Sequence, residues 1–213
     1  RELNVADNTI LWYCSDNGGH EGPKSTGNLR GSKGTLWEGG LRVPGIVEWP
    51  ARITKPFVSD VPCSTLDIYP TVLAATGTKA EKQIQPLDGI NVLPLIDRQM
   101  KSRDKAIPFV ARIDQVHSHA ALLDWPYKLH LNPNPGKQKK AGGDTATPAV
   151  LLYDVSKDPN ETTDLAAQQP ERVAKMTAAL EAWKASVVKS LAGADYGGGE
   201  AVPPIVKKKR TSN

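Results

Sequence analysis

The chain has 213 residues, of which 39% are hydrophobic and 23% charged, a composition that allows one packed domain with a small appendage. Its net charge is +4, and much of the excess lies in residues 137–140 and 207–210. No aromatic side chain interleaves with either basic patch, so we expect no nucleic-acid partner. No apolar run approaches the roughly 18 residues of a membrane span, and two cysteines do not make a disulfide framework.

Two strands and a helix are predicted in the first hundred residues. Residues 10–14 form a continuous apolar run, which is typical of a strand buried on both faces of a parallel sheet. Residues 43–49 predict a second strand. A helix is expected over residues 64–76, because Ser64 or Thr65 can cap its start and Gly77 can end it. We therefore interpret residues 1–104 as the end of an α/β domain.

Short β-rich segments separated by turn residues replace this pattern after residue 105. Segments 106–113, 119–131 and 149–155 predict strands, and the middle segment predicts a hairpin that turns near Asp124. Residues 132–148 are polar and rich in Gly, Pro and Lys, which indicates a long exposed loop.

A long helix is predicted from Pro170, because proline is favoured in a first helical turn. Apolar residues recur every three or four positions along about 33 Å of this helix. They are Val173, Met176, Leu180, Trp183, Val187 and Leu191. The stripe would serve either a partner-binding coil or packing on the small sheet, and packing is favoured. Residues 105–192 are thus expected to form a small antiparallel sheet with one long helix, followed by a disordered basic tail over residues 193–213.

A candidate binding site follows the first predicted strand. Asp16 and Asn17 offer side-chain oxygens, the ligands that Ca²⁺ and Mg²⁺ prefer, at the carboxyl end of a strand. Eight glycines follow between Gly18 and Gly40, and they permit positive φ and close backbone approach. Lys33 lies among them. A divalent cation would repel the lysine ammonium unless an anionic group, such as a sulfate or phosphate ester, lies between the two and contacts both. The same residues also fit a strand followed by a simple Asn-Gly turn.

The segment from residue 15 to residue 50, "SDNGGH…GSKGTLWEGGLRVPGIVEWP", resembles the C-terminal half of the sulfatase family, of the arylsulfatase-like kind, within the alkaline-phosphatase-like superfamily. "CSTLDIYPTVLAATG", "QPLDGINVLPLI", "WPYKLHL" and "LLYDVSKDPNETTDLA" resemble later parts of that family, in the same order. The resemblance covers roughly residues 5–190. It implies the C-terminal end of an α/β alkaline-phosphatase-like sandwich followed by a small antiparallel subdomain.

This resemblance also implies roles for individual residues. Asp16 and Asn17 match ligands of the active-site cation, usually Ca²⁺, with Mg²⁺ as the other candidate. Lys33 matches the lysine that contacts the substrate sulfate and stabilises charge on the leaving oxygen. His20 is a candidate for a substrate subsite, although a plain surface histidine fits its position as well. Residues 38–42 match a structural turn rather than a catalytic element.

Three histidines of the small sheet, His117, His119 and His130, show no clear site. His117 and His119 are spaced to put two imidazoles on one face of a strand. A metal site needs more ligands than this spacing supplies, so we predict no metal site there.

The nucleophile of the family is absent from this sequence. Sulfatases use a formylglycine made from Cys or Ser in a Cys/Ser-x-Pro-x-Arg motif, and neither Cys14 nor Cys63 lies in one. We expect the formylglycine in an N-terminal half, with any export signal upstream of Arg1, and we predict that residues 1–213 alone are inactive.

The resemblance implies a sulfated small molecule or glycan as substrate, and a periplasmic or extracellular enzyme. Two alternatives stay open: a phosphoester or phosphonate hydrolase of the same superfamily, and a truncated binding module without catalytic activity.

Overall fold

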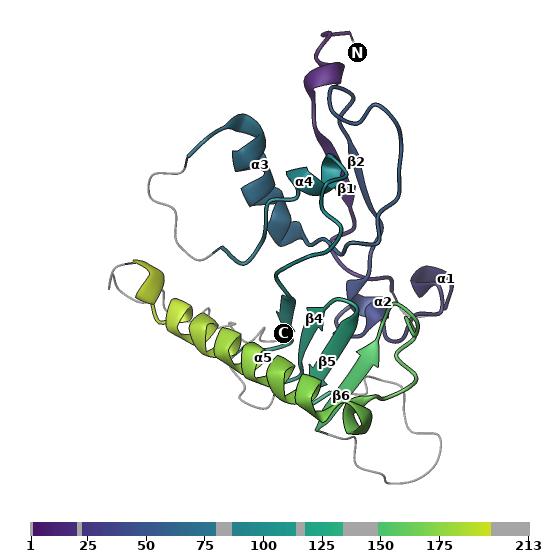
Figure 1. Ribbon diagram of the computed structural model, residues 1–213, viewed down its shortest axis with the longest axis vertical. Helices are drawn as coiled ribbons and strands as arrows, with labels where there is room; N and C mark the ends of the chain where they lie inside the picture. Colours follow the sequence, from purple (N-terminus) through teal and green to yellow (C-terminus); the bar gives the residue numbers. More distant parts are fainter. Residues whose placement is uncertain (1, 21–22, 80–86, 114–117, 134–148, 197–213) are drawn as a thin grey trace, which may run out of the picture.

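The computed structural model describes residues 2–20, 23–79, 87–113, 118–133 and 149–196 (Figure 1). The helices are α1 (Pro23–Thr26), α2 (Glu38–Leu41), α3 (Ile68–Thr76), α4 (Leu93–Ile96) and α5 (Pro170–Leu191), with 3-10 turns at Ala6–Asn8, Thr65–Asp67, Ala166–Gln168 and Ala194–Tyr196. The strands are β1 (Leu11–Cys14), β2 (Gly45–Glu48), β3 (Ile107–Val110), β4 (Ala120–Asp124), β5 (Tyr127–Leu131) and β6 (Val150–Asp154). Among these residues, no helix is long and apolar enough to cross a membrane.

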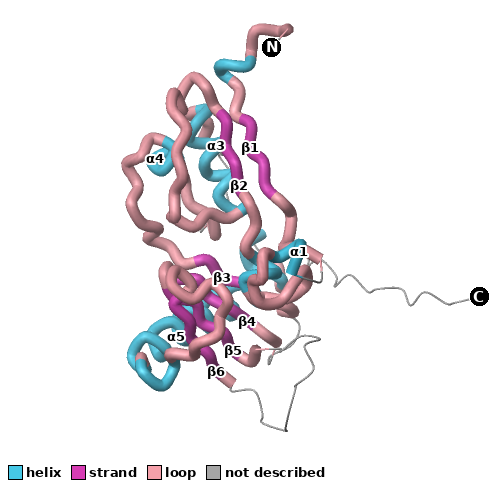
Figure 2. Tube along the Cα trace, turned by 90° about the vertical axis from the view of Figure 1, so that its right-hand side faces the viewer, coloured by secondary structure: helices cyan, strands magenta, loops and turns pink. Residues whose placement is uncertain are grey.

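Strands β1 and β2 form a two-stranded antiparallel ribbon, in which Tyr13 lies opposite Ile46. The strand predicted at residues 10–14 is confirmed, but its predicted parallel pairing and its burial on both faces are wrong for the described residues. Helices α3 and α4 cover one side of the ribbon (Figure 2), where Val47 packs on a core of Trp49, Leu93 and Ile96. Nothing among the described residues covers the other face, so Leu11, Tyr13 and Ile46 are 58%, 59% and 60% exposed.

Helix α3 ends where the sequence predicts, but it begins at Ile68, because residues Thr65–Asp67 form a 3-10 turn ahead of it. Ser64 and Asp67 form a capping box ahead of it, with the Ser64 amide donating to the Asp67 carboxylate at 2.7 Å. Gly77 ends the helix in the left-handed conformation, with φ of 65°. Asp67 also binds Arg103 in a buried ion pair of 2.7 Å, which ties the start of this helix to the segment that leads into the second sheet.

The second sheet has the order β3-β4-β5-β6 and is antiparallel throughout. The hairpin between β4 and β5 confirms the predicted turn, and α5 lies across one face of the sheet (Figure 1). Met176 and Leu180 of α5 are buried against Leu122, Leu129 and Leu152. The helix therefore packs on the sheet, as predicted for its apolar stripe, although Leu191 at its end is 57% exposed.

The opposite face of this sheet is covered by the glycine-rich segment. Side chains alternate between faces along a strand, so Leu129 points to α5 while Lys128 and His130 point the other way. Trp37 covers that second face and packs with Leu151 and Tyr153.

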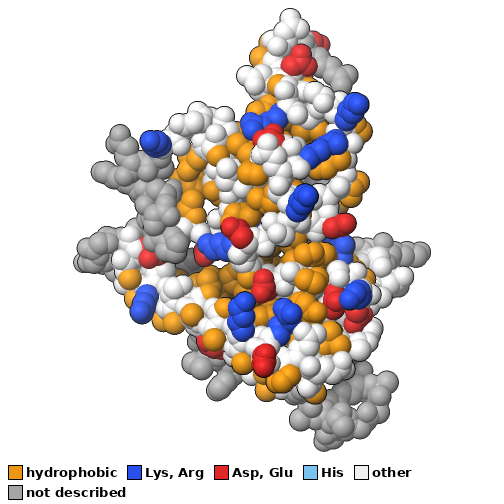
Figure 3. Space-filling view, in the orientation of Figure 1, with side chains coloured by type: hydrophobic (Ala, Val, Ile, Leu, Met, Phe, Trp, Pro, Cys, Tyr) orange, Lys and Arg blue, Asp and Glu red, His pale blue; other side chains and the backbone are white. Residues whose placement is uncertain are grey.

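Hydrophobic side chains also reach the surface over the α3–α4 region (Figure 3).

Parts of the predicted organisation lie outside the described residues. These are residues 134–148 of the predicted loop and residues 197–213 of the predicted tail. Residues 194–196 form a short 3-10 turn after α5. We propose that the boundary between the two parts of the chain lies near residues 104–105.

Candidate active site

Glycines allow two distant segments to meet at the end of β1. The amide of Gly18 donates to the carbonyl of Gly40 at 2.9 Å. A Cβ atom on Gly18 would lie 2.0 Å from the Gly39 carbonyl oxygen, far inside van der Waals contact. The segment after β1 can therefore lie against α2 only if position 18 has no side chain.

The turn that carries Lys33 lies against the same segment. The Lys33 amide donates to the Gly19 carbonyl at 2.8 Å. Gly31 and Gly34, which flank the turn, have φ of 75° and 86°, a region that favours glycine. Thr35 closes the turn through its hydroxyl, which donates to the Ser32 carbonyl at 2.8 Å. The Lys33 side chain is exposed, as a residue that reaches a ligand would be.

Asp16 and Asn17 come directly after β1, as the sequence predicts. Asp16 is exposed and Asn17 is half-buried. Throughout the described ranges, no hydrogen bond or ion pair engages the Asp16 carboxylate or the Asn17 side-chain amide, so their oxygens are available to a hard cation. The backbone contact with Lys33 brings the three residues into one neighbourhood. The convergence of their side chains on one ligand stays a prediction.

No complete metal site exists within the part of the chain that the structure describes, counting clusters of three or more His, Cys, Asp or Glu residues. Two residues supply at most about three of the six to eight oxygens that Ca²⁺ prefers. His20 is exposed, and its carbonyl accepts a hydrogen bond from the Ser25 hydroxyl. Its subsite role stays a prediction.

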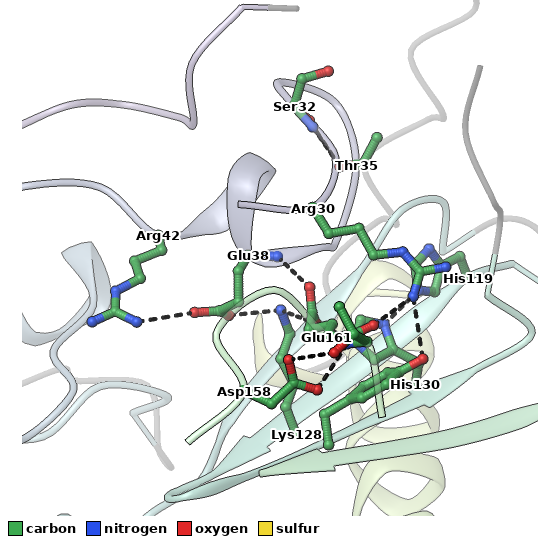
Figure 4. A network of polar contacts seen from close by, with 12 residues as sticks. Arg30, Ser32, Thr35, Glu38, Arg42, His119, Lys128, His130, Asp158 and Glu161 are labelled. Atoms are coloured by element: carbon green, nitrogen blue, oxygen red, sulfur yellow. Dashed lines mark hydrogen bonds and ion pairs between the residues drawn. The ribbon is translucent and has the colours of Figure 1, made fainter. Parts of the chain in front are cut away.

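Sequence reasoning missed a buried charge network beside this site (Figure 4). Lys128 is fully buried, and its ammonium lies 2.8 Å from Glu38 Oε1 and 3.1 Å from Glu161 Oε1. The other oxygen of Glu161 accepts the Glu38 amide at 2.7 Å. The network thus joins the start of α2, strand β5 and the segment after β6.

Two histidines extend the network into the sheet. His130 Nε2 lies 2.7 Å from Glu161 Oε1, and His130 Nδ1 lies 2.8 Å from His119 Nε2. Burial lowers the pKa of His119 to about 3, helped by the neighbouring His130 and Lys128. Burial also lowers the pKa of His130 well below its usual value, helped by Lys128 and Arg30. Both rings are therefore neutral near pH 7.

The proton arrangement follows from this neutrality. A carboxylate only accepts, so His130 donates its Nε2 proton to Glu161 and accepts the Nε2 proton of His119. Burial raises the pKa of Glu161, and the nearby Lys128 ammonium opposes part of that rise. His117 lies outside the described residues.

Arg30 closes the network over its aromatic side. Its guanidinium lies 3.6 Å from the ring centroid of Trp37, and Trp37 in turn stacks on His130 at 4.4 Å. Arg30 also donates to the Glu161 carbonyl at 2.8 Å and to the Tyr153 hydroxyl at 3.2 Å. The sequence feature that could have revealed this network is Lys128, a charged residue inside the predicted hairpin of residues 119–131.

Comparison with solved structures gives the class of fold. A structure from work on glycosaminoglycan metabolism by Bacteroides thetaiotaomicron matches with a TM-score of 0.67 and 27% identity, over 86% of this chain and 40% of that chain. Ps i-CgsB in complex with k-i-k-neocarrahexaose also matches with a TM-score of 0.67, at 28% identity, over 86% of this chain and 38% of that chain. The fold is that of the alkaline-phosphatase-like sulfatases, as the resemblance implied.

Sequence comparisons give the family. Residues 1–78 match the Sulfatase family model. The chain is 30% identical over 187 residues to a sulfatase of Formosa agariphila, which covers 84% of this chain and 33% of the relative. It is 32% identical over 178 residues to human arylsulfatase A, which covers 77% of this chain and 34% of that protein. The chain belongs to the sulfatase family and spans about a third of the length of these relatives.

Proposed function

We propose that these residues work as the C-terminal portion of a sulfuric ester hydrolase, supplying cation ligands and a sulfate-contacting lysine. The supporting observation is the 2.8 Å hydrogen bond between the Lys33 amide and the Gly19 carbonyl, which joins the Lys33 turn to the segment after β1. Oxygen ligands beside a lysine suit an ester whose oxygens carry negative charge. Membership of the sulfatase family favours sulfate as the group that is cleaved.

Asp16 and Asn17 are the residues proposed to hold the divalent cation, Ca²⁺ or Mg²⁺. Their oxygens suit a hard cation and are not engaged elsewhere in the described structure. When bound, the cation would act as a Lewis acid toward a sulfate oxygen. The match covers about a third of the relatives' length. We propose that the remaining ligands and the formylglycine belong to a region of the complete enzyme that corresponds to the other two thirds.

Lys33 has the clearest chemical task of the residues present. Its exposed ammonium, on a turn fixed by backbone hydrogen bonds, would contact the sulfate group and stabilise charge that develops on the leaving oxygen. We propose a sulfated small molecule or glycan as substrate, since one matched structure holds k-i-k-neocarrahexaose. A periplasmic or extracellular location is proposed from the same family relationship.

The test is hydrolysis of an aryl sulfate by a complete sulfatase that contains these residues, either the native polypeptide or a chimera with the remaining two thirds of the Formosa agariphila relative. Lys33→Ala should lower kcat by about 10²–10³, the usual scale for losing one charge stabiliser. Lys189→Ala, at an exposed position on α5, is the matched control and should leave kcat unchanged. Full turnover by the Lys33 variant would refute the proposed role.

A second arm tests the cation. Asp16→Ala should raise the Ca²⁺ concentration needed for half-maximal activity, whereas Asp60→Ala, at another exposed carboxylate, should not. Residues 1–213 expressed alone should give no turnover with millimolar Ca²⁺ added. Cation-dependent turnover by residues 1–213 that is lost in the Lys33→Ala variant would show that these residues hold the complete catalytic machinery.

A further inference from the structure

We infer that the buried charge network of the small sheet positions both loops of the candidate site, with Lys128 as its central positioning residue. The network comprises Glu38, Lys128, Glu161, His130 and His119 (Figure 4). The inference rests on the proposed function only for the chemical task of Lys33. Its structural part, that Lys128 controls the order of the two loops, is independent of that task.

The first step is the coupling of the sheet to α2. Lys128 is the cation between two carboxylates, and the side chains of Glu38 and Glu161 are 8% and 0% exposed. Two carboxylates this close and this dry need the ammonium between them, because water cannot screen their repulsion. The Glu38 amide also donates to Glu161 at 2.7 Å, so the backbone at the start of α2 is fixed along with its side chain.

The second step carries this constraint from α2 to the two loops. The Gly39 amide donates to the Arg30 carbonyl at 2.7 Å, and the Gly40 carbonyl accepts from Gly18 at 2.9 Å. Both segments lie in close contact with α2, because a Cβ on Gly39 would lie 2.5 Å from the Gly31 carbonyl oxygen and a Cβ on Gly18 would lie 2.0 Å from the Gly39 carbonyl oxygen. The position of α2 therefore sets the segment after β1 and the turn that carries Lys33.

Backbone strain supports the same assignment. Glu161 has φ of +55°, a conformation uncommon for residues other than glycine. It is held there by contacts from three directions: Lys128 and His130 at its carboxylate, and Arg30 at its carbonyl. Strained residues persist where surrounding contacts over-determine them, and they cluster at functional sites.

The test is amide hydrogen exchange on the 213-residue chain. Lys128→Met keeps the length and apolar stem but removes the charge. It should speed exchange of the Gly18 and Lys33 amides about tenfold more than exchange of the α5 amides. Arg103→Met is the matched control, because it removes another buried cation, 3% exposed, from a different ion pair. If Lys128→Met does not fold, Glu38→Gln tests the same link with a smaller change.

Two outcomes would overturn the inference. In one, the Gly18 and Lys33 amides exchange no faster in the Lys128→Met variant than in the Arg103→Met variant. The other is equal acceleration of every amide, α5 included, which would mean a general loss of stability.

A kinetic cycle in the complete enzyme separates this inference from the proposed function. Lys128→Met should lower kcat in the parent enzyme and lower it by a smaller factor in the Lys33→Ala background, because part of its effect acts through Lys33. An additive loss would overturn the coupling. If Lys33→Ala alone leaves kcat unchanged, the proposed function fails, and the exchange experiment still decides whether Lys128 orders the loops.

Discussion

Replacing Gly18 by alanine should destabilise the chain through a single new atom. The added Cβ would lie 2.0 Å from the Gly39 carbonyl oxygen and 2.6 Å from Gly40 Cα, whereas ordinary contact begins at 3.4 Å. The backbones must therefore separate by about 1.4 Å, the difference between these distances. That movement also stretches the 2.9 Å hydrogen bond from Gly18 to Gly40.

The size of the effect follows from which atoms are in the way. Overpacking typically costs about 1–3 kcal/mol, and backbone atoms cannot rotate aside as a side chain can, so we expect roughly 3 kcal/mol. With a urea dependence of about 2 kcal/mol per molar, the unfolding midpoint should fall by roughly 1.5 M.

Gly45→Ala is the matched control for this measurement. Gly45 is exposed in β2, and a Cβ there would meet nothing within 4 Å. Its substitution should be neutral or slightly stabilising, because alanine restricts the unfolded chain. A Gly18→Ala midpoint equal to that of the parent, or an equal fall in both variants, would refute the packing argument.

Two further predictions concern pH and solubility. The free energy of unfolding should fall as the pH drops below about 6.5, by up to about 1.4 kcal/mol per pH unit for each buried histidine, because the unfolded chain binds protons that the folded chain does not. His119→Gln should flatten this dependence in urea titrations at pH 7 and pH 5. The raised pKa of Glu161 acts in the opposite direction and offsets part of the slope. Ile46→Lys should reduce light scattering by the 213-residue chain without changing its unfolding midpoint, because Ile46 and the opposing Tyr13 form an exposed apolar pair. Unchanged scattering would mean that this face does not drive self-association.

Local signals in the sequence determined where several elements begin and end. Ser64 marks the 3-10 turn that leads into α3, and Gly77 marks the end of α3, because capping depends on hydrogen bonds within one or two turns. Pro170 marks the start of α5 for a similar reason, and the three-and-four spacing of its apolar residues selects the face that packs on the sheet. The order of Asp16, Asn17 and the glycine-rich turn also fits a simple turn, and it nominated the site only together with the resemblance to sulfatases.

Only the tertiary structure decided what covers each face. The alternation of residues 128–131 predicts one apolar and one polar face, and a polar face is ordinarily exposed to water. Lys128 and His130 are instead fully buried, because Trp37 and Glu38 cover that face. Glu38 and Glu161 are 123 residues apart, so no local pattern specifies their contact.

The glycines show the same division. Their abundance predicted positive φ and close approach, and Gly31 and Gly34 do have positive φ. Gly18 is required for a different reason, since its neighbour is the backbone of Gly39 and Gly40. Composition identifies a segment that can be approached closely, but the partner that approaches it depends on long-range packing, which the sequence of the segment does not contain.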